Sequence, residues 1–141
     1  MPRYLVVANL TLGGQALLEV LQDRVATGDA RLHVLVPASH SPDGWGSHDD
    51  KTDTDAARER LDQAMQRFQS LGAVEVTGQI GTSRPSDVIG DVLRQNSDDA
   101  FDEIILSTLP AGPSRWLAMD LPNKIRRSHD VPLTHVEARG D

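Results

Sequence analysis

The chain has 141 residues, a length that suits one compact domain with a core of its own. Its formal net charge is -7, which disfavours nucleic acid and anionic membranes as main partners, because both require clustered Lys and Arg. It has no cysteine, so disulfides and thiolate chemistry are excluded. The apolar runs are too short to span a bilayer and the N-terminal stretch lacks a signal-peptide pattern, so we expect a cytoplasmic protein.

Five short segments predict the strands of a buried parallel sheet. Four are continuous apolar runs, which are typical of strands covered on both faces, and the last contains a proline. The segments are residues 4–8, 32–36, 73–76, 104–106 and 131–136.

Between these segments, apolar residues recur with helical spacing and predict four helices. Gly28 and Gly72 follow the first two helices, where glycine commonly ends a helix, and Pro85 suits the first turn of the third. The predicted helices lie near residues 18–25, 57–71, 88–93 and 121–125.

Strands alternating with helices indicate a single α/β domain over residues 1–141, of the flavodoxin-like or Rossmann-like three-layer type. Right-handed crossovers favour five parallel strands in the order 3-2-1-4-5. A ligand would bind at the carboxyl edge, between the first and fourth strands, near residues 8–10 and from Ser107 onward. Residues 39–54, rich in Gly, Ser, Asp and His, predict a flexible loop.

The second half of the chain carries a family resemblance. After an apolar strand, a loop begins at Ser107, a helix covers 121–127, and 131–136 form a short strand with a proline. In order, length and spacing, over nearly the whole chain, the sequence resembles the universal stress protein family. Gly81 followed by Pro85 resembles its third strand–helix junction. The segments STLP, SRW and DLP are similar to small uncharacterised actinobacterial members.

The ATP-binding branch of that family carries Gly, two residues, Gly, nine residues, then Gly-Ser or Gly-Thr. The spacing survives here, but Ser107 and Pro110 replace the loop glycines, and Asp120 replaces the glycine of the final step. The family's usual Asp after the first strand corresponds to Asn9. The resemblance therefore implies a divergent member with an altered ATP motif.

These replacements change the chemistry of a phosphate loop. Glycines let backbone N–H groups approach phosphate oxygens, often at positive φ, whereas Pro110 has no N–H and cannot adopt positive φ. Asp120 is predicted to cap the following helix, so that its carboxylate occupies the N–H groups that a phosphate would use. Two such charges about 4 Å apart repel by roughly 1 to 4 kcal/mol.

Polar side chains offer a substitute for the glycines. Hydroxyls and one guanidinium, a group that pairs well with phosphate, follow the fourth strand. ATP or AMP is then the candidate ligand, and no cofactor is firmly predicted. The alternative is that Ser114 caps a short turn and Arg115 is a solvated or structural charge. The candidate degenerate nucleotide or anion site comprises Asn9, Ser107, Thr108, Ser114, Arg115 and Asp120.

The predicted loop at 39–54 holds polar groups that could gather a metal, but they lack ligand spacing, and a solvated acidic loop is favoured. These groups are His40, Asp43, His48, Asp49, Asp50 and Asp53. Trp45 in the same loop is a candidate lid, although packing on the domain is the favoured interpretation. Ser83 is predicted to cap the third helix, with anion contact by Arg84 as the alternative.

Three functional hypotheses follow. The favoured one is a non-enzymatic regulatory or accessory protein without standard ATP binding. The second is an ATP- or AMP-binding universal stress protein with a modified Ser/Thr/Arg loop. The third, a small hydrolase, is remote, because the sequence lacks a Gly-x-Ser-x-Gly elbow and because His33 and His135 lie within predicted strands, where a structural role is favoured.

The last predicted strand suggests a partner. If it lies at a sheet edge, its unpaired backbone groups must be covered or paired. The family resemblance implies a homodimer through this strand, antiparallel across a two-fold axis. Val131, Leu133 and Val136 suit such a contact, and Pro132 limits pairing on one side.

Overall fold

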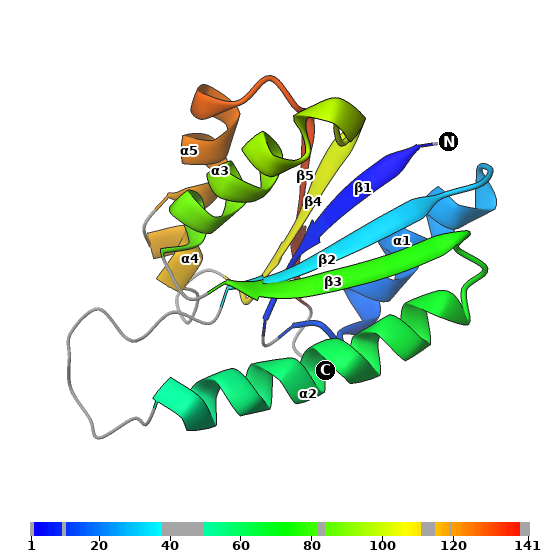
Figure 1. Cartoon of the computed structure of the whole chain (residues 1–141), viewed down its shortest axis with the longest axis horizontal. Helices are drawn as coiled ribbons and strands as arrows, with labels where there is room; N and C mark the ends of the chain where they lie inside the picture. The colour runs from blue at the N-terminus through cyan, green and yellow to red at the C-terminus, as the bar shows by residue number, and fades with distance from the viewer. Residues whose placement is uncertain are drawn as a thin grey trace.

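The computed structural model describes residues 2–9, 11–37, 50–81, 84–110, 115–118 and 120–138, with the backbone alone at 50–54, 115 and 118. Its centre is one parallel sheet in the order β3-β2-β1-β4-β5, as predicted. The strands are β1 (Arg3–Val7), β2 (Arg31–Pro37), β3 (Glu75–Gly81), β4 (Glu103–Thr108) and β5 (Leu133–Glu137). Figure 1 shows this twisted sheet between two layers of helices.

The helices are α1 (Gln15–Ala26), α2 (Asp50–Gln69), α3 (Pro85–Gln95), the 3-10 turn η1 (Ser97–Asp99), α4 (Arg115–Ala118) and α5 (Leu121–Ser128). Gly28 and Gly72 follow α1 and α2 with φ of 151° and 100°, which confirms their predicted role in ending those helices. No helix within the described ranges is both long and apolar enough to cross a membrane.

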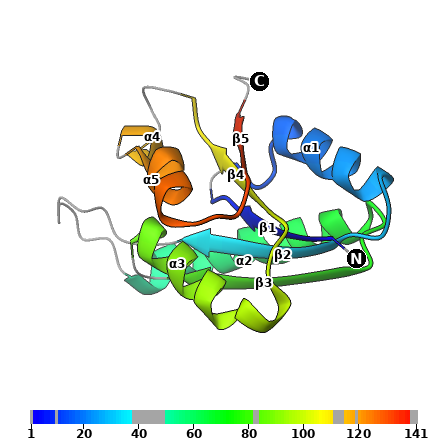
Figure 2. The ribbon, with the colours of Figure 1, turned by 90° about the horizontal axis from the view of Figure 1, so that it is seen from above.

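Side chains alternate along the strands and build a separate apolar core on each face of the sheet. On one face, Val6 and Val34 pack with α1 and α2, where Phe68 is fully buried. On the other, Leu5 and Val7 pack with α3 and α5. Figures 1 and 2 show the two helical layers on opposite sides of the sheet. The continuous apolar runs of the central strands arise because both of their faces are buried.

The structure differs from the predicted elements in three main respects. β3 spans Glu75–Gly81 instead of residues 73–76. It was placed wrongly because polar residues interrupt its sequence, whereas the prediction relied on continuous apolar runs. Residues 50–54, predicted as loop, form the first turns of α2, where acidic side chains favour a helix N-terminus. The short helix α4 was not predicted.

Candidate ligand site at the carboxyl edge of the sheet

The topology brings the predicted site residues together in part. β1 and β4 are neighbours, with Val7 opposite Leu106, so Asn9, just after β1, and Ser107, near the end of β4, lie at the same edge of the sheet. Ser114 lies outside the described residues, and Arg115 is described only as backbone, at the start of α4.

Ser107 points into the protein. Ser107 is only 1% exposed, and its Oγ lies 2.7 Å from Oγ1 of Thr11, a residue in the turn after β1. Thr11 is itself buried, and its carbonyl accepts a hydrogen bond from the N–H of Gly14. The pair ties the β1–α1 turn to the end of β4. Sequence reasoning missed Thr11, because the two residues are 96 positions apart.

Thr108 is committed to internal hydrogen bonds as well. Its hydroxyl donates to the carbonyl of Leu109 at 2.9 Å, and it lies 2.8 Å from Nε2 of His135 on β5. A hydroxyl has one proton to donate, so His135 must donate from Nε2 to Thr108. Burial lowers the pKa of His135, which favours this neutral form.

Asn9 is held on both sides of its amide. Its Nδ2 donates to the carbonyl of Pro37, the last residue of β2, at 3.0 Å. Its Oδ1 accepts a hydrogen bond of 2.8 Å from Nη1 of Arg60 on α2. Sequence reasoning missed Arg60, although its position beside the apolar stripe that begins at Ala57 is a signal that its stem packs toward the sheet.

Asp120 occupies the N-cap position of α5 as predicted, but it does not cap the helix with its side chain. Its backbone is left-handed, with φ of 58° and ψ of 39°, whereas a capping residue is usually extended. The carboxylate instead accepts a hydrogen bond of 2.9 Å from the Asn123 amide and lies 3.9 Å from Nη1 of Arg127. The prediction that this carboxylate occupies the helix N–H groups is therefore wrong.

The ATP-binding motif has a glycine at the position of Asp120, and glycine is the residue that most readily adopts the positive φ observed there. Asp and Asn tolerate this region better than most other residues. The chain thus keeps a backbone shape that suits glycine while placing a carboxylate there.

No protein-family model matches the sequence, and no curated protein matches it. Solved structures do match it in three dimensions. The universal stress protein UspA from Lactobacillus plantarum is 17% identical, with a TM-score of 0.71 over 96% of this chain and 97% of that one. The chain has the universal stress protein fold.

Two further structures with this fold hold nucleotides. The universal stress protein from Archaeoglobus fulgidus in complex with dAMP is 17% identical, with a TM-score of 0.60 over 96% of this chain and 97% of that one. A universal stress protein family protein from Arabidopsis thaliana with AMP bound is 14% identical, with a TM-score of 0.60 over 100% of this chain and 94% of that one.

Within this universal stress protein fold, α3 also starts at the carboxyl edge. Pro85 lies in the first turn of α3 as predicted, but the N-cap position falls on Arg84, whose side chain makes no capping hydrogen bond. Ser83, the residue predicted to cap this helix, lies outside the described residues.

Most of the metal-ligand and lid candidates in the predicted loop at 39–54 lie outside the described residues. This applies to His40, Asp43, Trp45, His48 and Asp49, while Asp50 and Asp53 are described only as backbone, in α2. The residues whose side chains are described contain no group of three His, Cys, Asp or Glu that could hold a metal.

The two strand histidines take structural positions in the described part of the fold. Nδ1 of His33 lies 2.7 Å from the Thr77 hydroxyl, and Nε2 lies 2.8 Å from Oε1 of Gln79. Burial is the main reason that the pKa of His33 is lowered. Ser107 contacts Thr11 and neither of these histidines, so these described residues do not form a serine–histidine pair.

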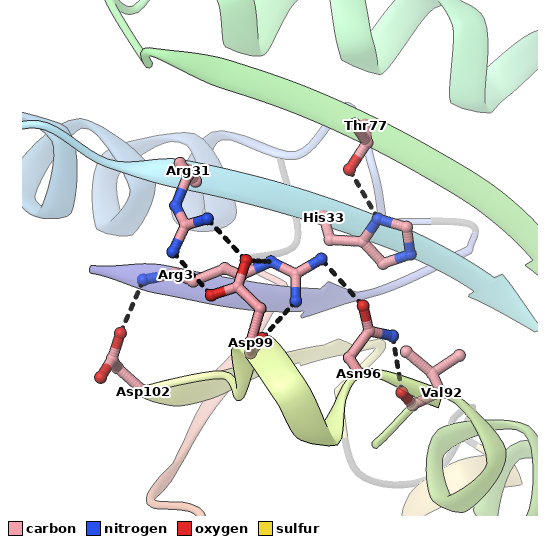
Figure 3. A network of polar contacts seen from close by, with 8 residues as sticks. All are labelled: Arg3, Arg31, His33, Thr77, Val92, Asn96, Asp99 and Asp102. Carbon is pink, nitrogen blue, oxygen red and sulfur yellow. Dashed lines mark hydrogen bonds and ion pairs between the residues drawn. The ribbon is translucent and has the colours of Figure 1, made fainter. Parts of the chain in front are cut away.

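The opposite, amino edge of the sheet is closed by ion pairs (Figure 3). Arg31 donates from both Nη atoms to the Asp99 carboxylate, at 2.7 and 3.0 Å, which lowers the pKa of Asp99. Arg3 donates to the Asp99 carbonyl at 2.5 Å and to Oδ1 of Asn96 at 3.0 Å. Its guanidinium also stacks 4.2 Å from the ring centre of Phe101. These groups join β1 and β2 to η1, so we assign this edge a structural role.

Proposed function

We propose that the protein is a non-enzymatic, cytoplasmic regulatory or accessory protein of universal stress type that does not bind ATP in the standard way. One observation carries the proposal: two of the hydroxyls that would substitute for the loop glycines, those of Ser107 and Thr108, already make hydrogen bonds inside the protein. Ser107 and Thr108 are 1% and 2% exposed. Turning the Ser107 hydroxyl toward a phosphate would leave the buried Thr11 hydroxyl without that partner, at a cost of about 1–3 kcal/mol. Turning the Thr108 hydroxyl would likewise remove the partner of the half-buried His135.

The charge at the start of α5 acts in the same direction. The Asp120 side chain is 55% exposed and carries its charge beside the helix N-terminus. A phosphate about 4 Å away would be repelled by roughly 1 to 4 kcal/mol. Pro110 adds no N–H to compensate for this repulsion.

Calorimetric titration tests the proposal. The purified protein is titrated with Mg-ATP, AMP and cyclic AMP, and we expect no saturable heat at millimolar ligand. The double variant Pro110→Gly/Asp120→Gly, which restores two glycines of the motif, serves as the comparison and is expected to bind more tightly. Saturable binding of Mg-ATP at micromolar strength by the unaltered protein would refute the proposal.

The second candidate is an ATP- or AMP-binding protein with a modified loop. The left-handed backbone of Asp120 favours it, because the chain retains the conformation that the motif glycine would adopt. The structures of similar fold with dAMP and AMP also favour it. Under this candidate, Asn9→Ala and Arg115→Ala should each weaken nucleotide binding, and unchanged affinity would remove those residues from the site. A small hydrolase remains a distant third candidate.

We further propose a homodimer through β5, which is an edge strand of the sheet. Val136 is buried in the core of its own chain, so the contact would rely on the strand backbone with the half-buried Val131 and Leu133. Sedimentation velocity should give the dimer mass for the unaltered chain and the monomer mass for Val131→Lys, because Val131 lies two residues before β5 and a charged side chain beside an edge strand opposes strand pairing. A monomeric unaltered chain at micromolar concentration would rule the dimer out.

A further inference from the structure

The contact between Arg60 and Asn9 places a cation at the carboxyl edge of the sheet. Asn9 lies two residues after the end of β1 at the carboxyl edge, and the Thr11–Ser107 contact holds the same turn against β4. Arg60 reaches this point from α2 and donates one N–H to Oδ1 of Asn9 at 2.8 Å. A guanidinium has five N–H donors, so this contact uses only one of them.

The charge of Arg60 is not balanced along its own helix. On a helix surface, ion pairs form between residues three or four positions apart. At these spacings on α2, Arg60 meets Ala56, Ala57, Gln63 and Ala64. Its contact Asn9 is a neutral amide, and among the described ion pairs Arg60 has no carboxylate partner. Arg60 is half-buried, so its charge is only partly screened by water while it stays within reach of a ligand.

We propose that Arg60 binds a small oxyanion, phosphate or carboxylate, at the carboxyl ends of β1 and β2. The planar fork of a guanidinium matches the two oxygens of such a group. Asn9, fixed between Arg60 and the Pro37 carbonyl, positions the guanidinium for this contact. The inference rests on the proposed function, because it assigns a ligand class to a sheet edge whose sequence has no standard phosphate loop.

An NMR titration with inorganic phosphate, at constant ionic strength, tests this role. In the unaltered chain, we expect saturating shifts of the Asn9 side-chain amide and of its neighbours. Arg60→Gln should raise the Kd about tenfold, because a charge-assisted hydrogen bond is roughly twice as strong as a neutral one. Arg60→Lys, which keeps the charge but loses the fork, should fall between the two.

Two further variants separate a local contact from general electrostatics. Arg67→Gln removes the same charge one heptad along α2, where Arg67 contacts the carbonyl of Gly13, and should leave the Kd unchanged. Asn9→Asp keeps Arg60 but gives it a carboxylate partner, and should weaken phosphate binding as much as Arg60→Gln does. The inference would be overturned if Arg60→Gln and the unaltered chain had equal Kd values while denaturant unfolding showed both proteins to be folded.

Parallel titrations with acetate and AMP identify the source of the oxyanion. Binding of phosphate or acetate that depends on Arg60, without binding of Mg-ATP, supports both the inference and the proposed function. AMP binding that depends on Arg60 and is much tighter than phosphate binding supports the inference and counts against the proposed function. Mg-ATP binding that ignores Arg60, with no phosphate binding, overturns both.

Discussion

Gly81, the last residue of β3, lies against Val88 of α3, and replacing it with alanine should measurably destabilise the protein. A Cβ atom built at Gly81 lies 2.8 Å from Cγ2 of Val88, 3.0 Å from its Cβ and closer still to its Cγ1. Carbon atoms in good contact are about 3.5–4.0 Å apart, so even the Cγ2 contact is about 0.7 Å too short. Val88 is 6% exposed and packed against the sheet, so it cannot move away without disturbing the core.

We expect Gly81→Ala to lower the free energy of unfolding by about 2–3 kcal/mol, within the usual range for overpacked cores. Urea unfolding measures this change. Gly13→Ala is the control, because its nearest atom is a terminal nitrogen of Arg67 at 3.5 Å, and it should cost less than about 0.5 kcal/mol.

A double variant tests the stated cause. Val88→Ala alone should cost about 2 kcal/mol through lost burial and a small cavity. In Gly81→Ala/Val88→Ala, the new methyl group fills that cavity, so the total should fall at least about 1 kcal/mol short of the sum. Additive costs, or equal costs for Gly81→Ala and Gly13→Ala, would refute the steric explanation.

Three other predictions concern single side chains. Asp120→Gly should be more stable to urea than Asp120→Ala by roughly 1 kcal/mol, because only glycine adopts the left-handed backbone without strain; equal stabilities would contradict that assignment. Ser107→Ala should cost about 1–3 kcal/mol by leaving the buried Thr11 hydroxyl unpaired, and the added change Thr11→Val should recover part of the loss, whereas a further loss would argue against the pairing. Burial lowers the pKa of His33 below its ordinary value of 6.5, so the folded chain takes up its proton less readily than the unfolded one. The contribution of His33 to the free energy of unfolding is fully present above pH 6.5 and is lost as the pH falls through the pKa of the folded chain. The free energy of unfolding should therefore depend less on pH, between about pH 7.5 and 5.5, in His33→Gln. An unchanged slope would rule out this contribution, although His135, with a shift in the same direction, should retain part of it.

Much of the fold was predictable because the central strands are buried on both faces. Their apolar runs are continuous, and the handedness of the crossovers restricted the strand order. The edge strand β3 was predicted less well, because its residues Thr77 and Gln79 are polar and interrupt the apolar run. Both form hydrogen bonds with His33 on the neighbouring strand. That pairing spans 44 and 46 positions in the chain, so no local pattern reports it.

The candidate site divides in the same way. Apolar periodicity and chain direction are local properties, so the order of the elements could be predicted, and with it the edge at which Asn9 and the end of β4 meet. The directions of the polar side chains depend on tertiary packing. Ser107 turns inward to Thr11, Arg60 reaches Asn9, and the Asp120 carboxylate bonds the Asn123 amide and makes no capping hydrogen bond to α5. The first two contacts join residues 96 and 51 positions apart, and a side chain selects such partners only after packing has brought the strands and helices together.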